Sequence, residues 1–113
     1  MKRLSQQTAG KSIPFRIKRA DTFLSRLKGL MFRRQPLQQE GLWLLPCSSI
    51  HMCFMNFSID AVFLDKNNRV VRLASHVKPW RFIAPVTSAS SVLELPAGSI
   101  EMLHLQTGDT LHL

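Results

Sequence analysis

The chain has 113 residues, of which 45% are hydrophobic and 19% are charged. This length is that of one domain, and this composition is typical of a globular protein and not of a disordered one. No apolar run approaches the roughly 18 residues that span a bilayer, and the basic start of the chain lacks the apolar stretch of a signal peptide. We therefore expect a single cytoplasmic domain with reduced cysteines and no membrane span.

The net charge of +8 is concentrated near the N-terminus. Residues 1–34 hold ten of the fifteen lysines and arginines but only one acid, Asp21. We predict that residues 1–11 are a disordered basic segment and that residues 12–113 form the single domain. A basic face of this kind either keeps the protein in solution or attracts a polyanion.

The first predicted elements are a strand and a helix. Apolar and basic residues alternate over residues 13–17, which is typical of a half-buried strand. Apolar residues then recur at helical spacing over residues 23–31, after a possible N-cap at Asp21 or Thr22. Gly29 interrupts this pattern, which indicates a close packing contact or the end of the helix.

The rest of the chain is predicted to be mostly strand. Apolar and β-branched runs bounded by turn residues cover residues 42–45, 50–54, 59–64, 69–77, 91–95 and 110–113. Asn67 and Asn68 tolerate a positive φ and favour a hairpin between the third and fourth of these runs. Residues 99–105 could form one or two helical turns. The predicted fold class is mostly β (α+β), a compact mixed sheet curled into a partly open barrel with one main helix near the N-terminus.

Six sequence motifs, in order, resemble those of a known family. They are Arg26-Leu27-Lys28-Gly29-Leu30-Met31, the stretch from Ile50 to Asp65, Arg69-Val70-Val71, Pro79-Trp80-Arg81, the stretch from Val92 to Gly98, and Gly108-Asp109. The family is known as domain of unknown function 192, and the resemblance covers about residues 15–113. It implies a small β-rich domain with one helix, and it implies no particular activity.

Four charged or titratable residues lie among apolar neighbours within these motifs, namely Arg26, His51, Asp60 and Glu94. An ionised group in such surroundings is costly unless it is paired. One prediction is that Asp60 or Glu94 forms an ion pair with Arg26 and so ties the helix to the sheet. The alternative is that the four residues, together with Met55, line a cleft that binds a small ligand.

Cys47, His51 and Cys53 have the most chemically suggestive spacing in the chain. They are soft ligands suited to Zn²⁺ or Cu⁺, but a closed zinc site needs four ligands, so a metal site is a minor alternative. Cys53 could also act as a nucleophile, with His51 as its base and Asp60 as the orienting group. Nothing in the sequence marks an oxyanion hole. We therefore expect no cofactor, and a protein without catalytic activity is favoured over an enzyme.

The sulfur-containing and aromatic side chains are predicted to be mostly core. The set comprises Met31, Met52, Met55, Met102, Phe23, Phe32, Phe54, Phe57, Phe63 and Phe82. Trp80 lies close to two cations, Lys78 and Arg81. It either covers one end of the predicted barrel or stacks on a base or a partner.

Three functions compete at this point. The favoured one is a non-enzymatic binding or accessory domain that holds a small ligand or a protein partner in the cleft near the central hairpin. The second is sequence-tolerant nucleic-acid binding, since no recognised nucleic-acid motif is present. Its candidate residues are Arg16, Lys18, Arg19, Trp80 and Arg81. The third is metal binding through the two cysteines and His51.

Overall fold

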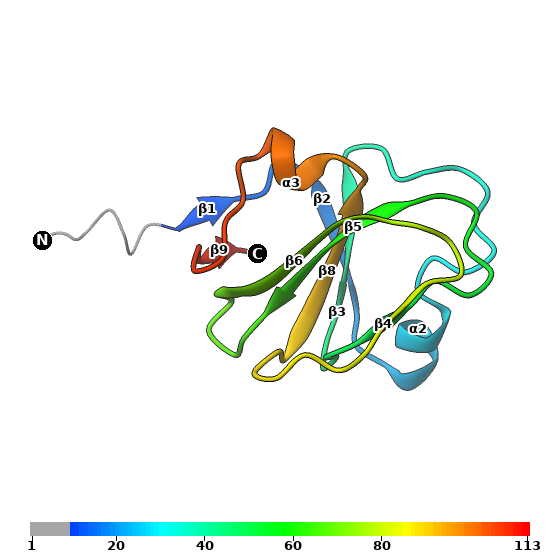
Figure 1. The fold of residues 1–113 in the computed structure, drawn as a ribbon, viewed down its shortest axis with the longest axis horizontal. Coiled ribbons are helices and arrows are strands. Elements are labelled where there is room, and N and C mark those ends of the chain that lie inside the picture. Colours follow the sequence, from blue (N-terminus) through cyan, green and yellow to red (C-terminus); the bar gives the residue numbers. More distant parts are fainter. Residues whose placement is uncertain (1–9) are drawn as a thin grey trace, which may run out of the picture.

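A five-stranded mixed sheet organises the chain. The structure is a computed structural model that describes residues 10–113. The strand order is β2 (Arg16–Ala20), β3 (Glu40–Leu44), β8 (Ser91–Pro96), β5 (Ile59–Leu64) and β6 (Val70–Val77). β2 runs parallel to β3, and every other neighbouring pair is antiparallel (Figure 1). The mostly β class and the predicted β5–β6 hairpin are therefore confirmed.

The sheet does not close into a barrel. β2 and β6 lie at its two edges, and no pairing joins them within residues 10–113. The prediction of a barrel is wrong because the central strands bury both of their faces against other parts of the chain. All six residues of β5 are buried for this reason.

Two apolar clusters cover the two faces of the sheet. Successive side chains of a strand point to opposite faces. In β5, Ala61 and Phe63 accordingly join the first cluster, whereas Val62 and Leu64 join the second. The first cluster also takes in Leu30, Ile50 and Met55 from the segments after β2 and β3, and the second takes in residues of the C-terminal part, namely Ile100, Leu105 and Leu111.

Two short strand pairs complete the structure. β1 (Lys11–Ser12) pairs in parallel with β9 (Leu111–His112), and β4 (Ile50–His51) pairs antiparallel with β7 (Phe82–Ile83). Lys11 also forms an ion pair with Asp109, at 3.0 Å between Nζ and Oδ2. Lys11 thus lies in a strand, although it was assigned to the disordered N-terminal segment, and residues 1–9 of that segment lie outside the described residues.

The two helices within residues 10–113 are short. α2 (Phe23–Lys28) begins at the N-cap Thr22, which exchanges hydrogen bonds with Ser25, and it ends at Gly29, whose φ is +48°. The helix follows two strands, so it is not N-terminal as the predicted fold class had it, and it is shorter than the predicted span of residues 23–31. α3 (Ser99–Met102) lies near the other end of the sheet. Neither helix of the described chain is long and apolar enough to cross a membrane.

The prediction of a sulfur-rich and aromatic core is only partly right. Met52, Met55 and Phe63 are buried, and Met31 and Phe57 are half-buried. The exposed members of the predicted set are Phe32, Phe54, Phe82 and Met102. These four lie in loops, in the two-residue strand β7 or at the end of α3, where no part of the sheet covers them. The side chain of Phe23 lies outside the described part of the structure.

Candidate functional site

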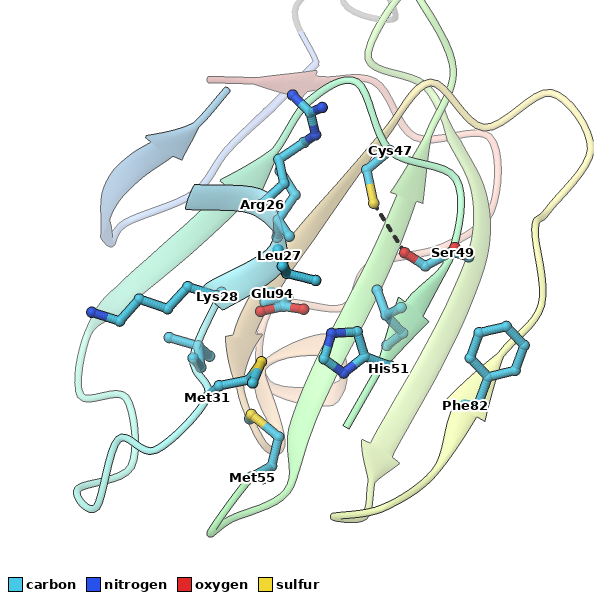
Figure 2. Close-up of a pocket in the computed structure, with 14 residues that line it drawn as sticks. Arg26, Leu27, Lys28, Met31, Cys47, Ser49, His51, Met55, Phe82 and Glu94 are labelled. Carbon is cyan, nitrogen blue, oxygen red and sulfur yellow. Dashed lines mark hydrogen bonds between the residues drawn. The ribbon is translucent and has the colours of Figure 1, made fainter. Parts of the chain in front are cut away.

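A pocket of about 240 Å³ lies beside α2 on the first face of the sheet (Figure 2). One wall comes from α2 and the residues after it, including Leu27 and Met31, and the other comes from the β4 region, including His51. Leu44 of β3 and Glu94 of β8 provide the base. A concave, mainly apolar pocket with a few polar groups is the usual form of a small-molecule site.

Glu94 is the buried acid at the base of this pocket. It pairs in register with Leu42 of β3 and Ala61 of β5, which places it in the middle of the sheet with only 5% of its surface exposed. Burial raises the pKa of its carboxyl group from 4.5 to about 8. Within residues 10–113, no ion pair or side-chain hydrogen bond engages this carboxyl group. An unsatisfied buried polar group is costly, so Glu94 is the group that a ligand would satisfy.

His51 adds a second polar group to the pocket. Its ring and the carboxyl group of Glu94 both line the pocket (Figure 2), and its Nδ1 accepts a hydrogen bond of 3.2 Å from the backbone N–H of Cys53. In the neutral imidazole this bond places the proton on Nε2. His51 therefore presents a hydrogen-bond donor to whatever occupies the pocket.

Cys47 lines the same pocket as a neutral thiol. Its Sγ donates to the carbonyl oxygen of Ser49 at 2.9 Å. Burial, and then the charge of Glu94, raise the pKa of this thiol. Because the thiolate is the reactive and metal-binding form, Cys47 is poorly suited to nucleophilic attack at neutral pH.

The predicted metal site is not assembled. Cys47 and His51 both line the pocket, but Cys53 does not. Both cysteines are free. In the portion of the chain that the structure covers, no group of three or more His, Cys, Asp or Glu residues could hold a metal ion. The metal-binding alternative therefore loses its geometric basis.

Arg26 lines the pocket without pairing with either buried acid. Its Nη1 donates to the carbonyl oxygen of Asp21 at 3.1 Å, and its guanidinium group points away from Glu94 (Figure 2). The predicted ion pair between Arg26 and Asp60 or Glu94 is therefore wrong. The capped turn that starts α2 already provides the guanidinium group with an acceptor at the helix surface.

Asp60 does not reach the pocket. It points to the opposite face of the sheet, where Oδ1 accepts from the backbone N–H of His76 at 2.9 Å and Oδ2 accepts from that of Ile100 at 2.8 Å. This fully buried carboxylate joins β6 to α3. Four of the five predicted cleft residues do line one pocket, namely Arg26, His51, Met55 and Glu94.

Sequence reasoning missed much of the pocket wall, including Leu27, Met31 and Phe82. Leu27 and Met31 fit the helical pattern, and Met31 is among the residues predicted to be core. The interruption at Gly29 was the available signal, because helical spacing no longer fixes the direction of side chains beyond a helix end. Phe82 faces His51 across the β4–β7 pair, and such a short pair leaves no pattern in the sequence.

A cluster of three exposed aromatic residues, Phe32, Phe54 and Trp80, lies near the pocket and is called here the aromatic cluster. The ring centroids of Phe32 and Phe54 are 5.0 Å apart, as are those of Phe54 and Trp80. Between 49% and 63% of each residue is exposed. All three have a φ between +59° and +66°, which costs roughly 1–2 kcal/mol for each residue with a side chain.

Backbone hydrogen bonds hold the loops of the aromatic cluster together. The N–H of Phe32 donates to the carbonyl oxygen of Phe54 at 2.9 Å, and the N–H of Trp80 donates to that of Met52 at 2.8 Å. Three segments that are distant in sequence are therefore fixed against one another. Trp80 packs edge-on against Phe54, with an interplanar angle of 61°, and does not cover the end of a barrel.

The predicted nucleic-acid residues do not form one surface. On the edge strand β2, Arg16 and Lys18 point to one face and Arg19 to the other. The guanidinium carbon of Arg19 lies over the ring of Trp43, 5.4 Å from its centroid, and its Nε lies 3.7 Å from Asp21. Trp80 belongs to the aromatic cluster instead. The basic strand and the tryptophan are thus held by different neighbours.

The fold and the pocket define a small open-sheet domain with one buried, unpaired acid at the base of an apolar pocket. The sequence pattern of the DUF192 family (uncharacterized ACR) matches residues 4–113. The chain belongs to this family, as the resemblance of its motifs indicated.

Relatives and solved structures agree with this assignment. A UPF0127 protein of Pyrococcus furiosus is 39% identical over 109 residues, which span 92% of this chain and 91% of that protein. A UPF0127 protein of Thermococcus sibiricus is 39% identical over 113 residues, which span 96% of this chain and 72% of that protein. The crystal structure of a protein of unknown function from Novosphingobium aromaticivorans has a TM-score of 0.76 at 27% identity, over 85% of this chain and 73% of that one. These similarities show the family and the fold.

Proposed function

We propose that the domain binds a small molecule in the pocket around Glu94, and that this molecule has an apolar body and a protonated amine. The observation that carries the proposal is the buried Glu94 carboxyl group without a partner at the base of an apolar pocket. The two free cysteines suit a reducing compartment, so we assign this function to the cytoplasm.

An amine is the ligand group that best relieves the burial of Glu94. A carboxyl group whose pKa is raised by burial recovers its charge when a cation is placed next to it. An ammonium group supplies this charge together with strong hydrogen bonds. A neutral acceptor would take the proton of the carboxyl group in one hydrogen bond and leave the second oxygen unsatisfied.

The rest of the pocket selects the other parts of the ligand. Met31 and Met55 present flexible apolar surface to its body. At the outer side, the Nε2–H of His51 and the cations Arg26 and Lys28 suit an acceptor or an anionic group. An apolar amino acid or an amino alcohol has this arrangement of an inner amine and an outer oxygen.

Binding is proposed in preference to catalysis. The Cys47 thiol is the nucleophilic side chain in the pocket wall, and its raised pKa keeps it protonated at neutral pH. No base is hydrogen-bonded to it, because its proton goes to the carbonyl oxygen of Ser49. The pocket of the described chain therefore supplies recognition groups and no activated reactive one.

Isothermal titration calorimetry tests this proposal with apolar amino acids, amino alcohols and their counterparts that lack the amine. Amines should bind, and their affinity should rise by up to about tenfold per pH unit between pH 6 and pH 8 as the proton of Glu94 becomes easier to release. Glu94→Gln should abolish binding. Glu101→Gln, at an exposed position of α3, should bind as the wild type does.

Two results would contradict the proposal. If the counterparts without an amine bind equally well, and most tightly at pH 6, the pocket recognises a neutral acceptor. If no compound of the panel binds the wild-type protein at any pH, the buried carboxyl group does not mark a site for amines.

A further inference from the structure

We propose that the end of the molecule that carries the aromatic cluster docks onto the surface of an anionic membrane. This inference concerns the outer surface around the pocket, which shares Leu27, Phe82, Arg26 and Lys28 with the pocket wall. It does not depend on which molecule the pocket binds.

The exposed apolar residues gather at this end of the molecule. The described residues include eight large hydrophobic residues that are exposed. Six of these lie on α2, on the loops after α2, β4 and β6, and in β7, namely Leu24, Leu27, Phe32, Phe54, Trp80 and Phe82. In Figure 1 these loops lie together at the end of the sheet opposite to β1 and β9. An exposed apolar surface of this extent is uncommon on a protein that contacts only water.

The backbone holds the three rings of the aromatic cluster outward. Phe32, Phe54 and Trp80 all have a positive φ, which is a marked departure for a bulky residue. The hydrogen bonds from Phe32 to Phe54 and from Trp80 to Met52 maintain these conformations. Strained positions that the surrounding structure maintains are typical of functional surfaces.

The segments that form this end carry only positive charge, and Asp21 and Glu40 are the acids that directly flank one of them. Residues 22–39, 45–59 and 76–90 contain no aspartate or glutamate. They contain six cations, namely Arg26, Lys28, Arg33, Arg34, Lys78 and Arg81. Arg33 pairs with Glu40, and the other five are not part of any ion pair formed among residues 10–113. The partner should therefore be anionic as well as apolar.

A membrane surface fits this combination better than a nucleic acid does. Tryptophan, phenylalanine and leucine next to lysine and arginine are typical of the surfaces that insert at a bilayer interface. The rings pack on one another with centroids 5.0 Å apart, which leaves no slot for a base between them. The exposed Leu24 and Leu27 extend the apolar area. Aliphatic side chains make no favourable contact with a sugar-phosphate backbone.

Co-sedimentation with vesicles tests the proposal on the full chain. Binding is expected to vesicles of phosphatidylcholine and phosphatidylglycerol, to weaken with added salt, and to be much weaker with phosphatidylcholine alone. Phe32→Asn and Trp80→Asn should each lower the partition coefficient roughly tenfold. Asparagine tolerates a positive φ, so both variants should keep the fold, as thermal unfolding would verify.

Matched controls separate this surface from the rest of the molecule. Met102→Gln removes another exposed apolar residue and Lys66→Gln another exposed cation, and neither lies on this end, so both should bind vesicles like the wild type. Glu94→Gln should also retain vesicle binding. In a Trp43→Phe background, the fluorescence of Trp80 should shift to shorter wavelength when anionic vesicles are added.

Three outcomes would overturn the proposal. The first is no binding of the wild-type protein to anionic vesicles at low salt. The second is unchanged partitioning of both asparagine variants. The third is tighter binding to a single-stranded oligonucleotide than to vesicles, together with loss of oligonucleotide binding in Trp80→Asn. This outcome would make this end a nucleic-acid surface.

Discussion

At the scale of single residues, the neighbours of a buried carboxyl group decide its role. Asp60 and Glu94 both lie in central strands and are both buried. Backbone N–H groups bind both oxygens of Asp60, whereas no described side chain binds Glu94, which faces the pocket. One acid is therefore part of the framework, and the other is the candidate recognition group.

The pH dependence of stability should reveal Glu94. Its pKa is about 8 in the folded protein against an ordinary value of 4.5, so the folded state holds a proton that the unfolded state has lost between these values. The free energy of unfolding should therefore fall as the pH rises from 4.5 to 8, by up to roughly 5 kcal/mol, and then level off. Urea unfolding at several pH values measures this fall.

Glu94→Gln should remove most of the decrease in the free energy of unfolding between pH 4.5 and pH 8. The variant should be more stable than the wild type at pH 8, because the amide carries no buried charge. Glu101→Gln should keep the wild-type profile, since Glu101 is exposed. Parallel pH profiles for the wild type and Glu94→Gln would show that Glu94 titrates normally. The lowered pKa of Glu40, caused by its hydrogen bond with Arg33, acts in the opposite direction and below pH 4.5.

Asp60→Asn should destabilise the protein by roughly 2–4 kcal/mol, because one of two buried N–H groups would face an amide nitrogen instead of an oxygen. Asp65→Asn is the matched control. The Oδ1 atom of Asp65 accepts hydrogen bonds from the backbone N–H groups of Asn67 and Arg69. The amide oxygen of asparagine can accept both of these bonds. Equal midpoints of thermal unfolding for the two variants would contradict this role of Asp60.

The sequence indicates which residues matter but not how they are paired. A charged residue in an apolar strand stands out, so all five predicted cleft residues turn out to be buried or at the pocket. The face to which each points depends on strand register. Asp60 and Glu94 lie on opposite faces because Asp60 is in register with Leu95, the neighbour of Glu94. That pairing joins residues far apart in sequence, so no local pattern contains it.

At the scale of elements, the regular strands were predictable and the short ones were not. The predicted runs 59–64 and 69–77 agree with β5 and β6 almost residue for residue, because their apolar patterns are bounded by clear turn residues. The predicted strand over residues 50–54 is only two residues long in the structure. Phe54 ends the strand because its φ is +59°. This conformation results from tertiary packing and cannot be predicted from the residue type.

Gly41 in β3 is an element-scale requirement for close packing. A Cβ atom there would lie 2.8 Å from Cδ2 of Leu95 and 2.9 Å from Cδ1 of Ile17. Gly41→Ala should therefore lower the free energy of unfolding by roughly 1–3 kcal/mol. Chemical denaturation measures the change, and Ser75→Ala on the exposed part of β6 should be nearly neutral. A fully stable Gly41→Ala protein would show that the side chains of Leu95 and Ile17 can rearrange at no cost.

At the scale of the whole molecule, the central strands and the pocket end differ in how they are held. β5 and β8 are hydrogen-bonded to a neighbour on each side and buried on both faces. The segment from Gly29 to Gln39 contains no regular strand or helix and exposes most of its residues. The binding end of the molecule is thus carried by loops on a rigid sheet.

Hydrogen exchange should follow this division. Amides of β5 and β8 should exchange only through global unfolding, whereas those of residues 29–39 should exchange through local opening and hence much faster. Mass spectrometry of peptides covering these segments measures the difference. Protection of residues 29–39 equal to that of β5 would mean that the pocket wall is as rigid as the sheet. A ligand that fills the pocket should slow exchange in this segment first.

The position of β8 in the sheet has a consequence for synthesis on the ribosome. β8 is the strand that joins β3 to β5, yet it comes from residues 91–96. Until these residues leave the exit tunnel, the chain can form only two separate pairs, β2 with β3 and β5 with β6. Each pair has an open strand edge, and both edges remain unpaired until β8 binds to them. The nascent chain therefore holds two unfinished half-sheets from the emergence of β6 until β8 follows, and during this late interval a chaperone can shield the open strand edges.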